Sequence, residues 1–500
     1  MGIITGDKEG VDGGILKRSG QNHSLLEQEK TSYISAIVMM GIFTFLFLCA
    51  EYLYVDIISF SVSEGKAVTA QNYALGISMV GFILYPVFNR FCKNTCRTIL
   101  SILITASSVV CVFLICRNIS YGATLISGLI LFLFLGLIGS AVFYISVCML
   151  PNDKYLARTV GISYMLGILL QFANNNLVPS EAIEAIILSV FLIVLVLMLM
   201  KQERTYGKNS IQNKSEAVLT GAENVKNDKE KSRGAKGNTA GLLLILLVIL
   251  MSCVFSTLDN AVTLVHATGE ADIGQLPRIL LAFSGLAAGF LFDIKDRKFM
   301  SLIMYCVMML STICIAVLKF AGPFLTGLII FYMTAGFFAV FFTTSFMELS
   351  RFMRLPDLWA GLGRAVNNIT AAVITGSSLA LLSSDDNIMV IILAVLLFVA
   401  VSVVAAAYIF QRNKLMGGFA ASAADNLNEE ERLQRVAEKF SFTPREAEVF
   451  NRLVSTEDSM QEIAESMYVS KRTLERYVSA IYEKTGVKSR VGLLNIYNNR

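Results

Sequence analysis

Near its end the sequence gathers cationic and polar side chains at helical spacing, over residues 467–490. This stretch has six basic and two acidic residues, whereas residues 443–466 have two basic and six acidic residues. Lysine and arginine neutralise phosphate groups, arginine also binds guanine, and a glutamate can accept a hydrogen bond from the cytosine amino group. The contrast predicts a basic face that binds nucleic acid, rather than a merely solvated helix surface. The side chains that we predict to contact DNA are Ser470, Lys471, Arg472, Thr473, Glu475, Arg476, Ser479, Lys484, Lys488 and Arg490.

Helix-start signals divide residues 440–500 into four short helices. In a capping box, a hydroxyl residue and a glutamate three positions later each bond the other's backbone N–H group, and the pattern occurs at Thr443–Glu446 and Ser459–Glu462. Further signals are hydroxyl caps for the third and fourth helices at Ser470 and Ser489, and a terminating glycine at Gly486. A short helix, a tight turn and a helix with a polar first turn form a helix-turn-helix, so the basic face would lie on its second helix.

The segments FTPREAEVF and QEIAESMYVSKRTLERYVSAIYEKTGV resemble the LuxR-type (NarL/FixJ-like) DNA-binding domain of helix-turn-helix transcriptional regulators. The resemblance implies that the helix after Ser470 enters the major groove of promoter DNA and that the protein binds as a homodimer. Glu475 and Tyr477 depart from the family, which usually has a basic or polar residue and a histidine at these positions. The departure at Glu475 implies an unusual operator preference.

The rest of the chain has the composition of an integral membrane protein. Of its 500 residues, 55% are hydrophobic and 16% are charged, and the mean hydropathy is +0.62, whereas about a quarter of the residues of soluble chains are charged. Apolar runs long enough to cross roughly 30 Å of hydrocarbon predict twelve transmembrane helices in two sets of six, within 33–200 and 239–410. The predicted fold class is therefore all-α, with a polytopic membrane domain before the four-helix domain at 440–500.

Polar segments flank the two sets of spans. Residues 1–32 lack the apolar core of a signal peptide, so we expect a cytoplasmic tail. Residues 201–238 are rich in lysine and poor in apolar residues, which predicts a disordered connector, and 411–439 is predicted to be a linker. Loops after even-numbered spans carry more lysine and arginine than loops after odd-numbered spans. The positive-inside rule therefore predicts that both termini are cytoplasmic, with the spans in a bacterial inner membrane.

Residue types that build metal and catalytic sites are scarce. The nine cysteines are scattered, mostly within apolar runs, and His23 and His266 are the only histidines. The cysteines lack the paired spacing of a zinc site. With two histidines, a histidine-built metal cluster or a serine–histidine triad is essentially excluded. We therefore expect no metal, no cofactor and no enzymatic activity.

A second resemblance lies between the eighth and ninth predicted spans. Residues 289–298, GFLFDIKDRK, are similar to the cytoplasmic G-x-L-x-D-R-x-G-R-K signature of the major facilitator superfamily. The resemblance implies a major-facilitator-like 6+6 arrangement and a motif for switching between inward- and outward-open states, although the segment could also be an ordinary positive-inside loop. Ile294 and Asp296 depart from the signature, and its first-half equivalent, YPVFNRFCKN at 85–94, is nearly lost, which suggests that continuous transport is no longer selected. The matching residues are Gly289, Asp293, Arg297 and Lys298.

Each half places a carboxylate late in its first predicted span. Charged groups at membrane depth are costly and usually face a cavity or a partner, although both acids could also be hydrated at the outer interface. Further polar residues in the spans would line the same cavity or form hydrogen bonds between helices. The candidate cavity residues are Glu51, Gln171, Asn174, Asp259, Asn260, Asn367 and Asn368.

Together these features predict a membrane-embedded one-component transcriptional regulator. Its expected partners are promoter DNA, membrane lipid and a small-molecule ligand of unknown identity, and its spans would sense that ligand or a membrane state. The alternative is a major-facilitator-type secondary transporter with a regulatory helix-turn-helix tail. A third possibility is that the tail binds another protein instead of DNA.

Overall fold

The computed structural model describes residues 9–498. Its gaps are at 93, 151–154, 220–222, 269–275, 320–323, 384–386, 457 and 488. Helix side chains also lie outside the described residues at 9–29, 94, 207–237, 265–268, 276–277, 312–319, 324–325, 387, 390–391, 417–432, 435 and 498. The regular structure of the described residues is α-helical, without a strand, which confirms the all-α prediction. Two compact units divide the chain, residues 1–213 with 227–411, and residues 214–226 with 412–500.

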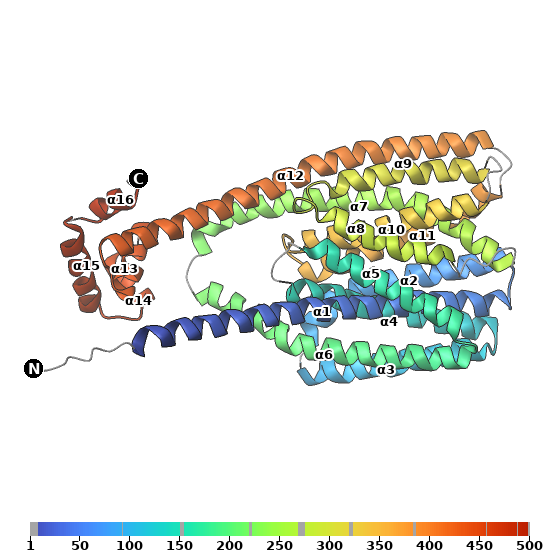
Figure 1. Cartoon of the computed structure of the whole chain (residues 1–500), viewed down its shortest axis with the longest axis horizontal. Helices are drawn as coiled ribbons and strands as arrows, with labels where there is room; N and C mark the ends of the chain where they lie inside the picture. The colour runs from blue at the N-terminus through green and yellow to red at the C-terminus, as the bar shows by residue number, and fades with distance from the viewer. Residues whose placement is uncertain are drawn as a thin grey trace, which may run out of the picture. The chain divides into compact units, whose positions relative to one another are not determined.

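The first unit is a bundle of long apolar helices (Figure 1). The helices of the first half are α1 Glu9–Ser59, α2 Glu64–Phe91, α3 Asn94–Arg117, α4 Tyr121–Met149, α5 Leu156–Leu177 and α6 Glu181–Leu219. Those of the second half are α7 Glu223–Thr268, α8 Leu276–Phe292, α9 Met300–Lys319, α10 Phe324–Ser350, α11 Pro356–Leu382 and α12 Asn387–Lys439. In the described residues, ten helices are long and apolar enough to cross a membrane, and α8 and α9 contain the shorter apolar stretches Arg278–Phe292 and Met300–Ser311. The protein is therefore a membrane protein.

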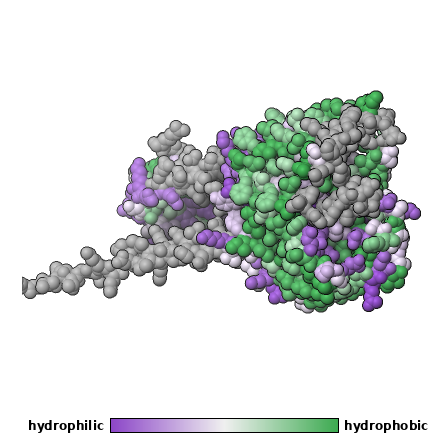
Figure 2. All heavy atoms as spheres, turned by 45° about the vertical axis from the view of Figure 1, so that its right-hand side comes forward, coloured by the Kyte–Doolittle hydropathy of each residue, from purple (hydrophilic) through white to green (hydrophobic). Residues whose placement is uncertain are grey.

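The two halves meet where α2 packs against α11 and where α5 packs against α8. Glycines allow the second of these pairs to approach closely, since a Cβ atom on Gly161 would lie 2.8 Å from the Cα atom of Gly289. The outer helices α3 and α12 expose apolar side chains such as Leu103 and Leu396. Figure 2 shows apolar side chains gathered over the surface of this bundle, as expected of a surface that faces lipid.

The polar segments beside the spans contain more helix than their composition suggested. In the predicted tail, α1 already begins at Glu9, and in the predicted disordered connector α6 continues to Leu219 and α7 begins at Glu223. In the predicted linker, α12 continues to Lys439. Elongating an existing helix costs far less than nucleating one, and the predicted connector and linker are rich in the strong helix formers lysine, glutamate, glutamine and alanine.

The second unit contains four short helices at its carboxy-terminal end, α13 Pro444–Ser455, α14 Met460–Ser466, α15 Lys471–Thr485 and α16 Arg490–Asn498. Both predicted capping boxes form, and in the first the Glu446 carboxylate accepts from the Thr443 N–H at 2.7 Å. The Ser470 hydroxyl accepts from the Thr473 N–H at 3.2 Å, and Gly486 ends α15 in the left-handed conformation, with φ 72°. The helices share a core that includes Val449, Phe450, Leu453, Ile463, Leu474, Ile481 and Leu493.

Candidate functional sites

The face of α15 that points away from the core is cationic. Leu474, Val478 and Ile481 are buried on its inner side. Seven of the predicted contact residues are exposed, namely Ser470, Lys471, Arg472, Thr473, Glu475, Arg476 and Ser479. Among the described residues, the side chains of the three cations in that set have no ion-pair or hydrogen-bond partner. The three cations are therefore available to neutralise phosphate groups.

Lys484 holds the domain together instead of extending this surface. Its Nζ atom lies 2.6 Å from the Glu446 carboxylate and donates to the Ser441 carbonyl oxygen at 3.0 Å. The hydrogen bond from Lys484, with help from the Thr443 backbone, lowers the pKa of Glu446. Sequence spacing could not separate this lysine from the exposed cations, because its partners lie about forty positions earlier.

Arg490 also has an internal role. Its guanidinium donates to the carbonyl oxygen atoms of Leu453 at 2.7 Å and Asp458 at 2.6 Å, and to that of Thr456. These acceptors lie at and just beyond the end of α13, where helix carbonyl groups lack partners. The last predicted contact residue, Lys488, lies outside the described residues.

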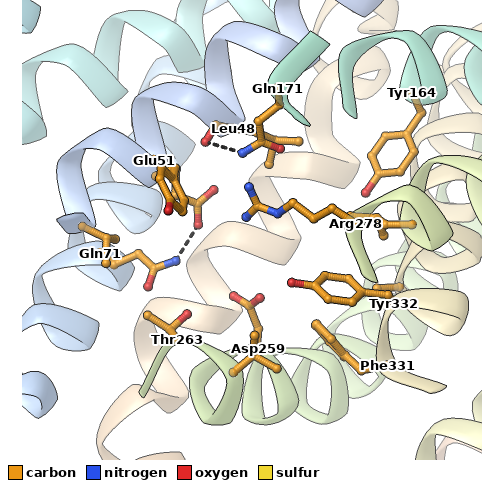
Figure 3. Close-up of a pocket in the computed structure, with 15 residues that line it drawn as sticks. Leu48, Glu51, Gln71, Tyr164, Gln171, Asp259, Thr263, Arg278, Phe331 and Tyr332 are labelled. Carbon is orange, nitrogen blue, oxygen red and sulfur yellow. Dashed lines mark hydrogen bonds between the residues drawn. The ribbon is translucent and has the colours of Figure 1, made fainter. Parts of the chain in front are cut away.

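Three of the predicted cavity residues line one cavity in the membrane unit. Glu51, Gln171 and Asp259 are brought together from α1, α5 and α7 around a volume of about 160 Å³ (Figure 3). Gln171 is anchored by a 3.0 Å hydrogen bond to the Leu48 carbonyl oxygen of α1. The two carboxylates therefore face a cavity, one of the two placements that sequence reasoning left open.

Sequence reasoning missed several polar groups of this cavity, including Gln71 of α2 and Arg278 of α8. Gln71 donates to the Glu51 carboxylate at 2.6 Å. The Arg278 guanidinium extends into the cavity and lies 5.3 Å from the ring centre of Tyr52. The signal in the sequence was its position at the start of the apolar stretch Arg278–Phe292.

The other four predicted cavity residues bond neighbouring helices instead of lining the cavity. Asn174 donates to Glu184 at 2.8 Å. The remaining bonds join the halves or the helices of one half: Asn260 to Ser378 and Asn72, Asn368 to Ser78, and Asn367 to Ser252. Amide side chains commonly hold membrane helices together in this way.

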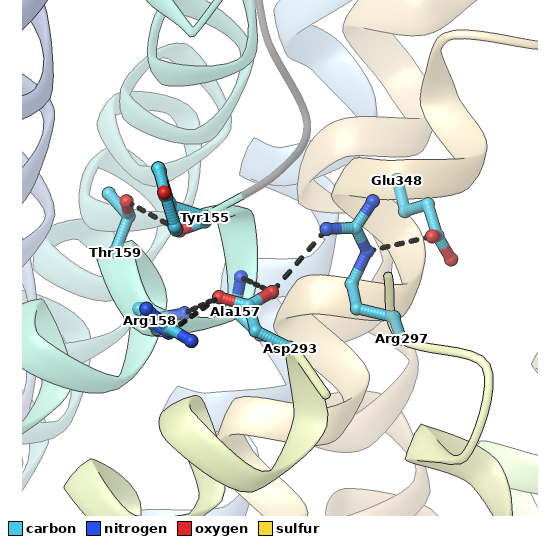
Figure 4. A network of polar contacts seen from close by, with 7 residues as sticks. All are labelled: Tyr155, Ala157, Arg158, Thr159, Asp293, Arg297 and Glu348. Carbon is cyan, nitrogen blue, oxygen red and sulfur yellow. Dashed lines mark hydrogen bonds and ion pairs between the residues drawn. The ribbon is translucent and has the colours of Figure 1, made fainter. Parts of the chain in front are cut away.

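The predicted conformational motif forms a buried polar cluster at the end of α8 (Figure 4). The Asp293 carboxylate accepts from the N–H groups of Ala157 at 3.1 Å and Arg158 at 2.8 Å, so it caps the first turn of α5 from another helix. Arg297 lies 3.4 Å from Asp293 and donates to Glu348 of α10 at 2.8 Å. The cluster therefore joins α5 of the first half to α8 and α10 of the second, while Lys298 is exposed.

The turn after α8 has an unusual backbone. Lys295, Asp296 and Arg297 all have positive φ, at 49°, 54° and 63°. The left-handed region disfavours residues with a Cβ atom, which accounts for the glycine of the resembling signature at the position of Asp296. Arg297 adopts this unfavourable backbone conformation in the same turn from which its side chain contacts Asp293 and Glu348.

The first half keeps a related contact although its motif is nearly lost. Asn89 occupies the position of Asp293, and it donates to Asp357 in the first turn of α11 at 3.3 Å. Arg90 lies 3.6 Å from the same carboxylate. In this contact the carboxylate belongs to Asp357 of α11, whereas in the other contact it belongs to Asp293 of the motif itself. The two contacts between the halves are therefore built with different residues.

Residues 440–496 match the family described as bacterial regulatory proteins, luxR family. This match and the four-helix geometry confirm the first resemblance, and these residues form a LuxR-type helix-turn-helix DNA-binding domain. No curated protein was found to match the chain.

The chain is similar to several solved transporter structures. One is a major facilitator superfamily transporter, FucP, in the outward conformation, with TM-score 0.49 and 13% identity over 75% of this chain and 99% of that chain. Another is an auto-inhibited POT family peptide transporter, with TM-score 0.49 and 11% identity over 77% of this chain and 97% of that chain. A variant of the E. coli fucose:proton symporter FucP has TM-score 0.48 and 14% identity over 75% and 99% of the two chains.

Proposed function

We propose that this protein is a membrane-embedded one-component transcriptional regulator. Its membrane unit senses a small molecule or a membrane state and controls binding of promoter DNA by the LuxR-type domain. The observation that carries the proposal is that one chain contains both this domain, with three unpaired cations on α15, and a membrane unit with a charged cavity. The proposal includes no enzymatic step.

The placement of the DNA-binding domain belongs to the same proposal. Basic residues concentrate in the loops after even-numbered helices, which supports cytoplasmic termini in a bacterial inner membrane. The domain acts there as a homodimer on two half-sites, by analogy with other helix-turn-helix proteins.

Control requires two states of the membrane unit. A ligand shifts their equilibrium only if it binds one state more tightly than the other. Because α12 contains residues of both units, a change of state in the membrane unit would reach residues 440–500 through this helix. There it would alter the exposure or the pairing of these residues.

Replacing Lys471, Arg472 and Arg476 together with alanine tests the DNA-binding part. We expect at least about a hundredfold loss of affinity for the chain's own upstream DNA and a salt dependence whose log–log slope is shallower by about 5, because the homodimer loses six phosphate-neutralising cations. Binding is measured by footprinting with the full chain in lipid nanodiscs over a salt series. Arg445→Ala, at an exposed cation of α13 that pairs with Glu448, is the control and should bind normally. Unaltered binding by the triple variant would refute the proposal.

A working secondary transporter with a regulatory tail is the second candidate, and the cavity carboxylates favour it. Proton- or solute-driven uptake into vesicles that Glu51→Gln or Asp259→Asn abolishes would establish transport. A vesicle assay without driven uptake, together with ligand-dependent DNA occupancy, would favour the sensor.

A further inference from the structure

The cavity in the membrane unit contains a carboxylate that the protein leaves unpaired. Among the described residues Asp259 has no hydrogen-bond or ion-pair partner. Figure 3 shows its carboxylate directed into the cavity, toward the space below Arg278. Arg278 attracts this carboxylate electrostatically without an ion-pair contact, so a ligand that donates to Asp259 would add a hydrogen bond that the described residues do not supply.

Several hydrogen-bonding atoms around this space have no partner among the described residues. Gln71 uses its N–H group on Glu51, and its own Oε1 atom is buried without a partner. Arg278 Nε also lacks an acceptor. Both oxygen atoms of Asp259 and the Gln71 carbonyl oxygen can therefore accept hydrogen bonds from a ligand, and the Arg278 guanidinium can donate to one.

The charges that line the cavity are also unequal. Glu51 and Asp259 are two acids, and Arg278 is the one described basic side chain that lines it. Arg364 interacts electrostatically with Glu51, but its guanidinium lies over the rings of Phe47 and Phe342, at 5.2 and 5.6 Å, and does not line the cavity. The lining therefore attracts a cation more strongly than an anion.

Size and aromatic content narrow the class of cation. A cavity of about 160 Å³ is close in volume to the engineered cavity of about 150 Å³ that holds benzene. Tyr52, Tyr164, Phe331 and Tyr332 line it, and aromatic faces attract organic ammonium groups. We propose that the cavity binds a small protonated amine with an apolar or aromatic body, whose ammonium group lies between Glu51 and Asp259. The inference rests on the proposed function, because it names the ligand class of the sensing site.

Three probes of matched shape and different charge test the class: benzylammonium, neutral benzyl alcohol and anionic benzoate. The full chain in nanodiscs is titrated with each probe, and the midpoint of thermal unfolding is measured. Benzylammonium should raise the midpoint saturably, whereas the other two should not. Saturable binding of benzoate, equal binding of benzyl alcohol, or no binding of benzylammonium up to millimolar concentration overturns the proposal.

Variants then locate the bound ammonium group. Asp259→Asn and Glu51→Gln should each weaken benzylammonium binding about tenfold or more, because each removes a charge-assisted hydrogen bond. Arg278→Gln should preserve or strengthen binding, since it removes the opposing cation. Glu181→Gln, at an exposed acid of α6 outside the cavity, is the matched control and should bind normally. Unchanged affinity in both acid variants, or loss of binding in Arg278→Gln, overturns the assignment. If one acid variant does not fold, the other and the probe series still decide.

The outcomes separate this inference from the proposed function. Benzylammonium binding without any change in DNA occupancy would support the ligand class and contradict sensing. Absence of amine binding in a chain that binds DNA through Lys471, Arg472 and Arg476 would contradict the ligand class alone.

Discussion

At the scale of single residues, chemically similar cations have different roles in the LuxR-type domain. Lys471 and Arg476 are exposed on α15 without partners among the described residues, whereas Lys484 binds Glu446 and Arg490 binds three carbonyl groups. Sequence reasoning treated all of them as DNA contacts because it saw type and spacing only. Since the partners of Lys484 and Arg490 lie 32 to 43 positions earlier, only folding reveals which cations are occupied.

The pair formed by Lys484 and Glu446 predicts a dependence of domain stability on pH. Because the pKa of Glu446 is lowered in the folded state, its contribution is fully present above its unfolded-state pKa of about 4.3. That contribution is lost as pH falls through the lower folded-state value. Glu446→Gln should therefore reduce the free energy of unfolding of the 412–500 fragment by about 1 kcal/mol at pH 7 and by less at pH 3. Urea denaturation at the two pH values measures the difference.

Glu462→Gln provides the control for that measurement. Glu462 occupies the same position in the capping box of α14 but has no ion-pair partner among the described residues. Its substitution should have a smaller effect at pH 7. A difference between Glu446→Gln and the unaltered fragment that is as large at pH 3 as at pH 7 would contradict the charge explanation.

At the scale of elements, helix ends are held by residues of other helices. Asp293 caps the start of α5, and Arg490 at the start of α16 binds the carbonyl groups at the end of α13. Local capping boxes were readable from sequence because both partners lie within four residues. The contacts between helices were not readable, because nothing local specifies which helix end will be near.

Arg490→Ala and Arg476→Ala should therefore affect different properties of the domain. Arg490→Ala should lower the free energy of unfolding by about 1–2 kcal/mol, since it strands several carbonyl groups. Arg476→Ala should alter stability by no more than about 0.5 kcal/mol, because Arg476 is exposed, and should weaken DNA binding instead. Denaturation midpoints and binding isotherms of the two variants measure both properties. Equal destabilisation by the two substitutions would contradict this division.

At the scale of the whole molecule, the topology predicted from the basic residues must place the LuxR-type domain in the cytoplasm, where DNA is found. The proposed topology has an even number of spans, which returns the LuxR-type domain to the side of the amino terminus. An odd number would put the domain outside the cytoplasm, so topology is a direct test of the proposed function.

Reporter fusions measure that topology in a bacterial host. A fluorescent protein fused after residue 500 should fluoresce, and alkaline phosphatase fused after residue 62, between α1 and α2, should be active. The converse fusion of alkaline phosphatase after residue 500 should be inactive. An active phosphatase at residue 500 would refute cytoplasmic placement of the DNA-binding domain.

The sequence by itself determined the all-helical class, the membrane character, the capping boxes and the inner and outer faces of α15. Each of these follows from composition or from residues a few positions apart, and local physics suffices for them. Tertiary structure decided that Glu51, Gln71, Asp259 and Arg278 share one cavity while Asn260 and Asn368 bond helices. It also decided that α6 and α12 continue into segments that composition had assigned to a connector and a linker. Such outcomes depend on which helices pack together, and packing is set by the whole chain at once.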